Sequence, residues 1–246
     1  MHRNLLFDLD QTLLDFHASE RIALKLVMEM NGLGFAEKNY DFFRQNNKNL
    51  WLEFEKGIIS RTELFEQRFR RLFEECGCDP GRIDLIKANN DFIDLMSRNG
   101  VPMKGVTDFL KKARNDIPDA RIYVVTNGVT RNAVGRICST GLDEYITEVF
   151  VSENIGVSKP AKEYFDFVTK VIGDPIGSYI VIGDSLTSDM LGARNSNLTS
   201  CWFMPDGDPE RAMKEYKISY SASSFDELFD VLIRWSSLPV IRETGE

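Results

Sequence analysis

Short apolar runs occur near the start of the sequence and again, repeatedly, from residue 105 onward. They are rich in β-branched and aromatic residues and bounded by turn-forming residues, which is typical of buried strands. Between them, apolar residues return every three or four positions, which predicts amphipathic helices. The predicted strands span residues 4–8, 121–126, 148–151, 179–183 and 200–204; the clearest helix faces are Val106, Phe109, Leu110 and Ala113, and Phe165, Val168 and Ile172, with Pro160 expected to start the second helix.

The alternation of strands and helices defines the expected fold class. Apolar strands joined by helical crossovers form parallel sheets that are covered on both faces. The sequence therefore predicts an α/β fold, with a Rossmann-like, three-layer parallel sheet and helices on both faces.

The first crossover is far longer than a single helix requires. A βαβ unit takes about 30 residues, whereas the strand that follows residues 4–8 begins only at residue 121. The intervening pattern predicts four helices, which would form an inserted all-helical cap domain. We expect a catalytic core of residues 1–15 and 100–238, a cap of residues 16–99 and a flexible tail of residues 239–246.

Capping signals and apolar spacing suggest bounds for the cap helices. The first is expected over residues 19–30, and the second is expected to stop at Gly57. The third opens with a capping box from Ser60 to Glu63, and the fourth has Asp79 as its N-cap, with Pro80 in its first turn. The expected buried faces are Ile22, Leu26, Val27 and Met30; Phe43, Leu50, Trp51 and Phe54; Leu64, Phe65, Phe69, Leu72 and Phe73; and Ile83, Ile86, Ile93 and Met96.

Composition and charge narrow the classes of partner. The 246 residues carry a formal net charge of −8, which argues against nucleic acid because such binding rests on clustered Lys and Arg. The longest apolar runs are too short to span a bilayer, and Asp8 and Asp10 interrupt the apolar N-terminal stretch before a signal peptide could form. Four Cys without a secretion signal favour reduced thiols in a cytoplasmic protein. We expect a monomer or homodimer with no nucleic-acid or membrane partner.

Polar residues that could take part in catalysis or ligand binding follow several of the predicted strands. In open α/β sheets, ligands bind just beyond the carboxyl ends of the strands. Asp8, Thr126 and Asp184 each lie at such an end, so residues nearly 180 positions apart are expected to converge on one edge of the sheet. The segments concerned are Asp8-Leu9-Asp10-Gln11-Thr12, Thr126-Asn127-Gly128, Ser158-Lys159-Pro160 and Gly183-Asp184-Ser185-Leu186-Thr187-Ser188-Asp189.

This convergence would crowd four carboxylates together: Asp8, Asp10, Asp184 and Asp189. Two carboxylates 4 Å apart repel by about 4 kcal/mol at an effective dielectric constant near 20. A counter-charge is needed, and oxygen-only ligands favour Mg²⁺ over a softer metal. Lys159 is the expected fixed cation.

The residue types in this set suit phosphoryl transfer through an aspartyl-phosphate. Asp8 is the expected nucleophile, and Asp10 the expected general acid and then base. The expected metal ligands are the Asp8 carboxylate, the Asp10 backbone carbonyl and Asp184, with Asp189 holding metal-bound water or the surrounding loop; the expected phosphate-binding residues are Thr126, Asn127 and Lys159.

At these residues the chain resembles the haloacid dehalogenase-like phosphohydrolase superfamily. The superfamily's four motifs occur here in order: Asp8-x-Asp10-x-Thr12, Thr126, Lys159, and Gly183-Asp184 with the later Asp189. The resemblance implies that the helical insertion is a C1-type cap, and Asp10 argues against a true haloacid dehalogenase, which lacks this second acid.

Further segments resemble the bacterial pyrimidine 5′-nucleotidase branch of that superfamily. They are Leu50-Trp51, Glu55-Lys56-Gly57-Ile58, Val151-Ser152-Glu153, Gly156-Val157-Ser158-Lys159-Pro160 and Cys201-Trp202. The resemblance implies a small phosphorylated substrate, a nucleoside monophosphate in the sharpest form of the hypothesis.

Other functions stay open at this point. A phosphatase for phosphoglycolate or sugar phosphates, a phosphomutase, and a non-enzymatic phosphate-binding regulatory protein are all compatible with the fold. Cys76 and Arg82 have the Cys-x₅-Arg spacing of cysteine phosphatases, but Asp79 would lie inside the phosphate loop and no strand precedes Cys76. His17, just after the first motif, is a candidate residue of the cap hinge, and Trp51 and Phe54 are expected to pack in the cap core.

Overall fold

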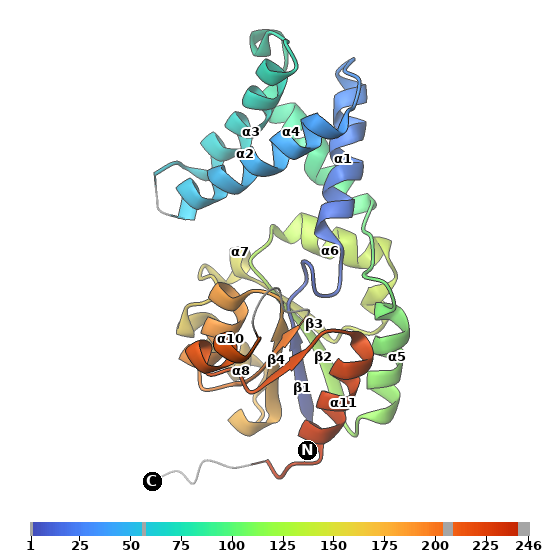
Figure 1. Cartoon of the computed structure of the whole chain (residues 1–246), viewed down its shortest axis with the longest axis vertical. Helices are drawn as coiled ribbons and strands as arrows, with labels where there is room; N and C mark the ends of the chain where they lie inside the picture. The colour runs from blue at the N-terminus through green and yellow to red at the C-terminus, as the bar shows by residue number, and fades with distance from the viewer. Residues whose placement is uncertain (1, 56–57, 204–208, 241–246) are drawn as a thin grey trace. The chain divides into compact units, whose positions relative to one another are not determined.

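The computed structural model describes residues 2–55, 58–203 and 209–240 (Figure 1). It divides into two compact units, one comprising Met1–Phe16 with Gly100–Glu246 and the other His17–Asn99. Three predictions lie partly or wholly outside the described residues: Gly57 as a helix stop, Met204 as the end of a strand, and most of the tail 239–246.

A six-stranded parallel sheet forms the centre of the first unit, as far as the chain is described, with the strand order β3-β2-β1-β4-β5-β6. The predicted α/β fold is confirmed, with a helical insertion between β1 and β2. All five predicted strands are present, and a sixth, β6, was not predicted. The bounds are β1 Arg3–Phe7, β2 Ala120–Thr126, β3 Glu148–Val151, β4 Tyr179–Gly183, β5 Thr199–Phe203 and β6 Tyr220–Ala222.

Helices cover both faces of this sheet (Figure 1). Leu5 and Phe7 of β1 pack in one hydrophobic cluster with α5, α6 and α11, whereas Leu6 packs in a second cluster with α8 and α9. Successive side chains of a strand point to opposite faces, so this split builds the three layers. The bounds are α5 Val106–Asp116, α6 Thr130–Ser139, α7 Ser152–Ile155, α8 Lys162–Ile172, α9 Leu191–Asn195, α10 Pro209–Tyr216 and α11 Phe225–Ser236, with short turns at η2 Leu142–Glu144, η3 Ile176–Ser178 and η4 Leu186–Met190.

The predicted faces of α5 and α8 are confirmed for the most part. All four predicted residues of α5 are buried, as are Phe165 and Val168 of α8, while Ile172 is only partly buried. The prediction for Pro160 was wrong, because α8 begins at Lys162, after Ala161 as its N-cap. No helix in the described parts of the chain combines the length and the apolar character needed to cross a membrane.

The second unit is helical and has its own aromatic core. Phe43, Phe69 and Phe92, from three different helices, have ring centroids 5.4 to 5.6 Å apart. The predicted capping box is present, with Ser60 and Glu63 each bonded to the other's backbone N–H. The bounds are α1 Phe16–Met30, α2 Glu37–Glu55, α3 Arg61–Glu75, η1 Pro80–Arg82 and α4 Leu85–Arg98.

The predicted start of the fourth cap helix was wrong. Asp79 caps only the short 3₁₀ turn η1, where its carboxylate accepts a hydrogen bond from the Gly81 N–H at 3.0 Å. The N-cap of α4 is Asp84, which accepts from the Lys87 N–H at 2.9 Å. The sequence offers two acidic caps in close succession, and the chain uses both.

Several predicted faces of the cap helices also differ from the structure. Ile22 and Met30 of α1 and Ile86 of α4 are exposed. The periodicity was assigned from the large apolar residues alone, whereas the buried faces include small and polar ones. Trp51 and Phe54 contact each other edge to face, with centroids 5.7 Å apart, but both are only half-buried. The buried residues are Ser19, Glu20, Ala23, Leu24, Val27 and Met28 in α1, and Leu85, Ala88, Asn89, Phe92 and Met96 in α4.

The two segments that join the sheet to the helical insertion pair with each other on the sheet side of the junction. The Asp15 N–H donates to the Val101 carbonyl at 2.8 Å, and the Met103 N–H donates to the Leu13 carbonyl at 3.0 Å. Leu14 and Pro102 form an antiparallel bridge between these bonds. The chain thus leaves and re-enters the first unit at one place.

Candidate active site

The carboxyl ends of three neighbouring strands bring the predicted site residues together. Thr126 is the last residue of β2, and Asp8 and Asp184 directly follow β1 and β4. The Asp8 N–H donates to the Ile182 carbonyl at 2.8 Å, which extends the pairing of β1 with β4. Carboxylate oxygens of Asp8, Asp184 and Asp189 lie within 4.8 Å of one another. The structure therefore places a cluster of acids at this edge of the sheet.

Lys159 is the buried cation of this cluster. Its Nζ donates to Asp8 Oδ1 and to Asp189 Oδ1, each at 2.6 Å, and to the Val125 carbonyl at 2.8 Å. The three ammonium hydrogens therefore have three acceptors. Because the side chain is only 1% exposed, these bonds fix its position.

Asn127 holds the backbone of Lys159. Its Nδ2 donates to the Lys159 carbonyl and its Oδ1 accepts from the Lys159 N–H, both at 2.9 Å. This paired contact joins the end of β2 to the loop before α8. The sequence marked Asn127 as a polar residue at a strand end, but not as a partner of the Lys159 backbone.

Asp189 is buried in the turn after β4. Its Oδ2 accepts from the Ser185 N–H at 3.2 Å, and its Oδ1 is the acceptor from Lys159. A Cβ on Gly183 would overlap the Asp189 carboxylate, so glycine is needed at the end of β4. Both Asp189 oxygens thus have protein partners, and the side chain ties the turn to Lys159.

The Thr126 side chain is buried and organises the turn after β2. Its Oγ1 accepts from the Gly128 N–H at 3.1 Å. A hydroxyl that accepts one bond retains its own hydrogen for a second partner. Thr126 can therefore donate to a ligand beyond the edge of the sheet.

Asp10 has a partner that the sequence did not reveal. Its Oδ1 accepts from Arg136 Nη1 at 2.6 Å. Arg136 lies on α6, and its side chain is only 1% exposed. The available signal was its position, because Arg136 continues the buried face formed by Ala133 and Ile137.

Burial and like charge dominate the electrostatics of the cluster. Burial raises the pKa of Asp8 well above its ordinary value; the Lys159 ammonium opposes this shift, and the neighbouring carboxylates add to it. Burial, with a contribution from Asp189, raises the pKa of Asp184 to about 6. Burial acts to lower the pKa of Lys159, but Asp189 and Asp8 outweigh it, so that this pKa is raised.

The charges of the site do not balance among its own residues. Four carboxyl groups, those of Asp8, Asp10, Asp184 and Asp189, face two buried cations, Lys159 and Arg136. Full ionisation leaves a formal excess of two negative charges. An oxygen-rich site with this excess fits a hard divalent cation.

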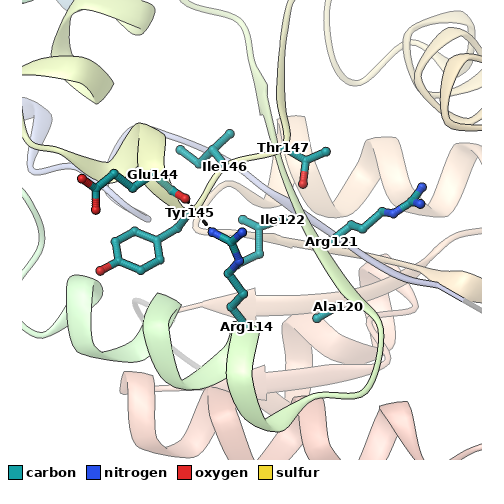
Figure 2. A pocket seen from close by; sticks show the side chains of 8 residues that line it. All are labelled: Arg114, Ala120, Arg121, Ile122, Glu144, Tyr145, Ile146 and Thr147. Atoms are coloured by element: carbon teal, nitrogen blue, oxygen red, sulfur yellow. Dashed lines mark hydrogen bonds between the residues drawn. The ribbon is translucent and has the colours of Figure 1, made fainter.

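The first unit also contains a cavity that is separate from the acid cluster. A cavity of about 370 Å³ adjoins the first residues of β2 and the segment before β3, and in it Arg114 donates to the Glu144 carbonyl at 2.6 Å (Figure 2). It therefore lies at the amino ends of the strands, opposite the acid cluster. The residues that line it are Arg114, Ala120, Arg121, Ile122, Glu144, Tyr145, Ile146 and Thr147.

The Cys76 motif does not form a phosphate loop. Cys76 caps the end of α3, and burial raises the pKa of its thiol. A cysteine nucleophile requires a lowered pKa. Arg82 is exposed and forms an ion pair with Asp79 at 3.5 Å. His17 belongs to the helical unit, where its ring lies 3.9 Å from Glu20 and 3.4 Å from Arg44.

The sheet, the helical insertion and the acid cluster together define a class of hydrolase. The sequence profile of the haloacid dehalogenase-like hydrolases matches residues 2–197, and the chain belongs to that family. The resemblance stated from the four motifs is thereby confirmed.

Individual relatives match nearly the whole chain. YfnB of Bacillus subtilis is 32% identical over 232 residues, covering 94% of this chain and 95% of YfnB. The pyrimidine 5′-nucleotidase PynA of Streptococcus pneumoniae is 31% identical over 232 residues, with the same coverage. The pyrimidine 5′-nucleotidase YjjG of Escherichia coli is 30% identical over 199 residues, covering 80% of this chain and 84% of YjjG.

A solved structure shows the same similarity in three dimensions. The crystal structure of YfnB bound to magnesium matches with a TM-score of 0.81 at 31% identity, covering 94% of this chain and 98% of that chain. That structure reveals interdomain movement in YfnB.

Proposed function

We propose that this protein is a Mg²⁺-dependent phosphomonoesterase that works through an aspartyl-phosphate intermediate. The observation that carries the proposal is the cluster at the edge of the sheet, where the Asp8 carboxylate lies beside Lys159, Asp184 and Asp189. A carboxylate nucleophile, a fixed cation and an excess of acidic oxygens are what phosphoryl transfer requires.

The donor set fits a magnesium ion. We assign the Asp8 carboxylate, the Asp10 backbone carbonyl and Asp184 as its ligands, and the structure of magnesium-bound YfnB supports that choice of metal. When bound, the ion would supply positive charge that lets an anionic phosphate approach an anionic carboxylate. Because both Asp189 oxygens already have partners, Asp189 is assigned to the turn and to metal-bound water rather than to direct ligation.

The reaction then proceeds in two steps on this chain's own residues. Asp8 attacks phosphorus in line, while Asp10 gives its proton to the departing alkoxide as the P–O bond breaks. Asp10 then takes a proton from water, whose oxygen attacks the phosphorus of the aspartyl-phosphate. Inorganic phosphate leaves and Asp8 is restored.

The remaining residues stabilise the transferring group. Lys159 offsets charge on the phosphoryl oxygens, and the Thr126 hydroxyl donates to them. Asn127 contributes its backbone N–H, because its side chain already binds the Lys159 backbone. We further propose that residues 16–99 act as a cap that sets selectivity and excludes water during the reaction.

The proposed substrates are pyrimidine nucleoside 5′-monophosphates. The similarity to PynA and YjjG supports this choice. A second candidate is a small-metabolite phosphatase, because a phosphatase for a ribityl-amino-uracil phosphate, YigB of Escherichia coli, is 29% identical over 212 residues. Phosphoglycolate and sugar phosphates are further candidate substrates of such a phosphatase.

The test is turnover of p-nitrophenyl phosphate with Mg²⁺ and with EDTA, followed by a screen of nucleotides, sugar phosphates and phosphoglycolate. We expect Mg²⁺-dependent release of phosphate, fastest with pyrimidine monophosphates. Asp8→Asn should reduce turnover to the uncatalysed rate while its circular dichroism spectrum stays that of the wild type.

Each negative result has a separate meaning. Activity confined to sugar phosphates or phosphoglycolate would exclude the nucleotidase but retain the phosphatase. Phosphate transfer to a sugar hydroxyl would indicate a mutase. Phosphate binding without turnover by the wild type would indicate a regulatory binding protein, and activity in Asp8→Asn would mean that the nucleophile is wrongly assigned.

A further inference from the structure

We propose that Arg136 is a positioning residue that orients the Asp10 carboxyl group for proton transfer to the leaving group. This inference rests on the phosphatase reaction proposed above and adds a residue that lies outside its four motifs. Arg136 donates a hydrogen bond to Asp10, and its effect on the reaction passes through Asp10.

The contact between the two residues divides the Asp10 carboxyl group into a held and a free side. Arg136 Nη1 donates to Oδ1 at 2.6 Å. The guanidinium is 1% exposed, whereas the Asp10 side chain is 31% exposed. Oδ1 is therefore anchored from the protein interior, and Oδ2 is the oxygen left to exchange a proton with a substrate.

Arg136 is itself held from several directions. The Phe16 ring packs on its guanidinium, with 5.4 Å from the ring centroid to Cζ. Its backbone carbonyl accepts bonds from the Ser139 and Thr140 hydroxyls, each at 3.0 Å. A Cβ on Gly100 would lie 2.6 Å from that carbonyl, so only glycine allows the returning chain to pass so close.

Burying the Arg136 guanidinium is energetically unfavourable, so the presence of arginine here calls for an explanation. Taking a charge out of water is unfavourable even with a partner, and replacing a whole buried ion pair by apolar side chains of similar volume is often neutral or stabilising. Arg136 Nε also has no hydrogen-bond partner in the described structure. Packing alone does not require a charge at this position, so the bond to Asp10 is the feature that distinguishes arginine here.

The reaction explains what that bond provides. A general acid must place its proton within about 2.6–3.2 Å of the leaving oxygen. Asp10 lies in the loop after β1, where Gln11 has a positive φ of 60° and the Leu9 carbonyl accepts from the N–H groups of Leu13 and Leu14. The backbone is fixed by these bonds, and Arg136 fixes the remaining torsions of the side chain.

The test measures how kcat/KM depends on the leaving group, with Mg²⁺ present throughout. kcat/KM covers the steps up to departure of the leaving group and is independent of hydrolysis of the aspartyl-phosphate. The substrates are p-nitrophenyl phosphate, phenyl phosphate and a nucleoside 5′-monophosphate. The first has a good leaving group that needs little protonation, and the last leaves as an alkoxide that needs a full proton.

We expect Arg136→Met to lose about 10- to 100-fold in kcat/KM on the alkyl phosphate, since a small misplacement of a catalytic group has an effect of this size. The loss on p-nitrophenyl phosphate should be within about threefold, because an acidic phenol gains little from general-acid catalysis. Arg136→Lys keeps the buried charge and provides a second variant should Arg136→Met fail to fold. Arg136→Lys should also lose more kcat/KM on the alkyl phosphate than on p-nitrophenyl phosphate, but by a smaller factor than Arg136→Met.

Ile137→Ala is the matched control, because Ile137 is buried on the same helix and packs in the hydrophobic cluster beside the sheet. It should lower kcat/KM on all three substrates in parallel, if at all. A parallel loss in the Arg136 variants would mean that Arg136 is only structural, and would overturn the inference while the wild type still confirms the phosphatase. A wild type inactive on every phosphate monoester would overturn the proposed function and this inference with it.

Discussion

Asp184 shows how one side chain at the edge of the sheet links proton binding to metal binding. Its pKa is raised to about 6, chiefly by burial and then by Asp189. The unfolded chain releases this proton near the ordinary value of 3.8. Between these two values the folded, metal-free protein holds a proton that the unfolded chain has lost, so its stability falls as the pH rises through this window.

We therefore expect the gain in Tm on adding Mg²⁺ to be small at about pH 5 and large at about pH 7.5, because a metal ligand must be deprotonated. The raised pKa of Asp8 acts in the same direction. Thermal unfolding with Mg²⁺ and with EDTA measures this, and Asp184→Asn should remove the gain at both pH values. An equal gain at both pH values in the wild type would contradict the assignment of Asp184 as a ligand.

The residues of the site differ in how far the sequence can identify them. Asp8, Thr126 and Asp184 could be placed together because each ends an apolar strand, and parallel strands end at one edge. Lys159 could be identified because the crowded carboxylates need a positive charge beside them. Arg136 could not be found in this way, because a charged residue on a helix is ordinarily solvated. The structure shows that Arg136 lies on the buried face of α6, together with Ala133 and Ile137.

At the scale of elements, strands were easier to predict than helix ends. β1 and β4 are buried along their whole length; β4 is apolar throughout, and β1 is apolar from Leu5 to Phe7. β6 escaped prediction because it is only three residues long and contains Ser221 in its middle. For α4, Asp79 and Asp84 are both good N-caps, and local sequence alone does not decide which of them begins the helix.

The two caps should therefore differ in their contribution to stability. Asp84→Ala should lower the free energy of unfolding by about 1 kcal/mol, because it removes the side-chain acceptor for an N–H of a full helix. Asp79→Ala should cost less than about 0.5 kcal/mol, since Asp79 caps one exposed turn and its ion pair is solvated. Urea denaturation of both variants measures the difference; an equal or larger cost for Asp79→Ala would show that η1 supports α4 more than its contacts suggest.

At the scale of the whole molecule, the spacing of the strands was enough to predict the helical insertion. No single crossover helix could occupy the interval between β1 and β2, and the apolar periodicity within it was helical. The inward faces of α1 and α4 were harder, because Ser19, Glu20 and Asn89 are buried there. A periodicity built on apolar residues leaves such positions out.

The paired segments around Leu14 and Pro102 give the insertion a property of its own. Because the chain departs and returns side by side, residues 17–99 can be replaced by a short Gly-Ser turn without altering the register of any strand. We expect the shortened protein to unfold cooperatively and to retain the circular dichroism of an α/β sheet; loss of cooperativity would show that the sheet depends on the insertion. On the proposed role of the insertion in selectivity, exchanging one set of helices for another here would change the accepted substrates and leave the acid cluster in place.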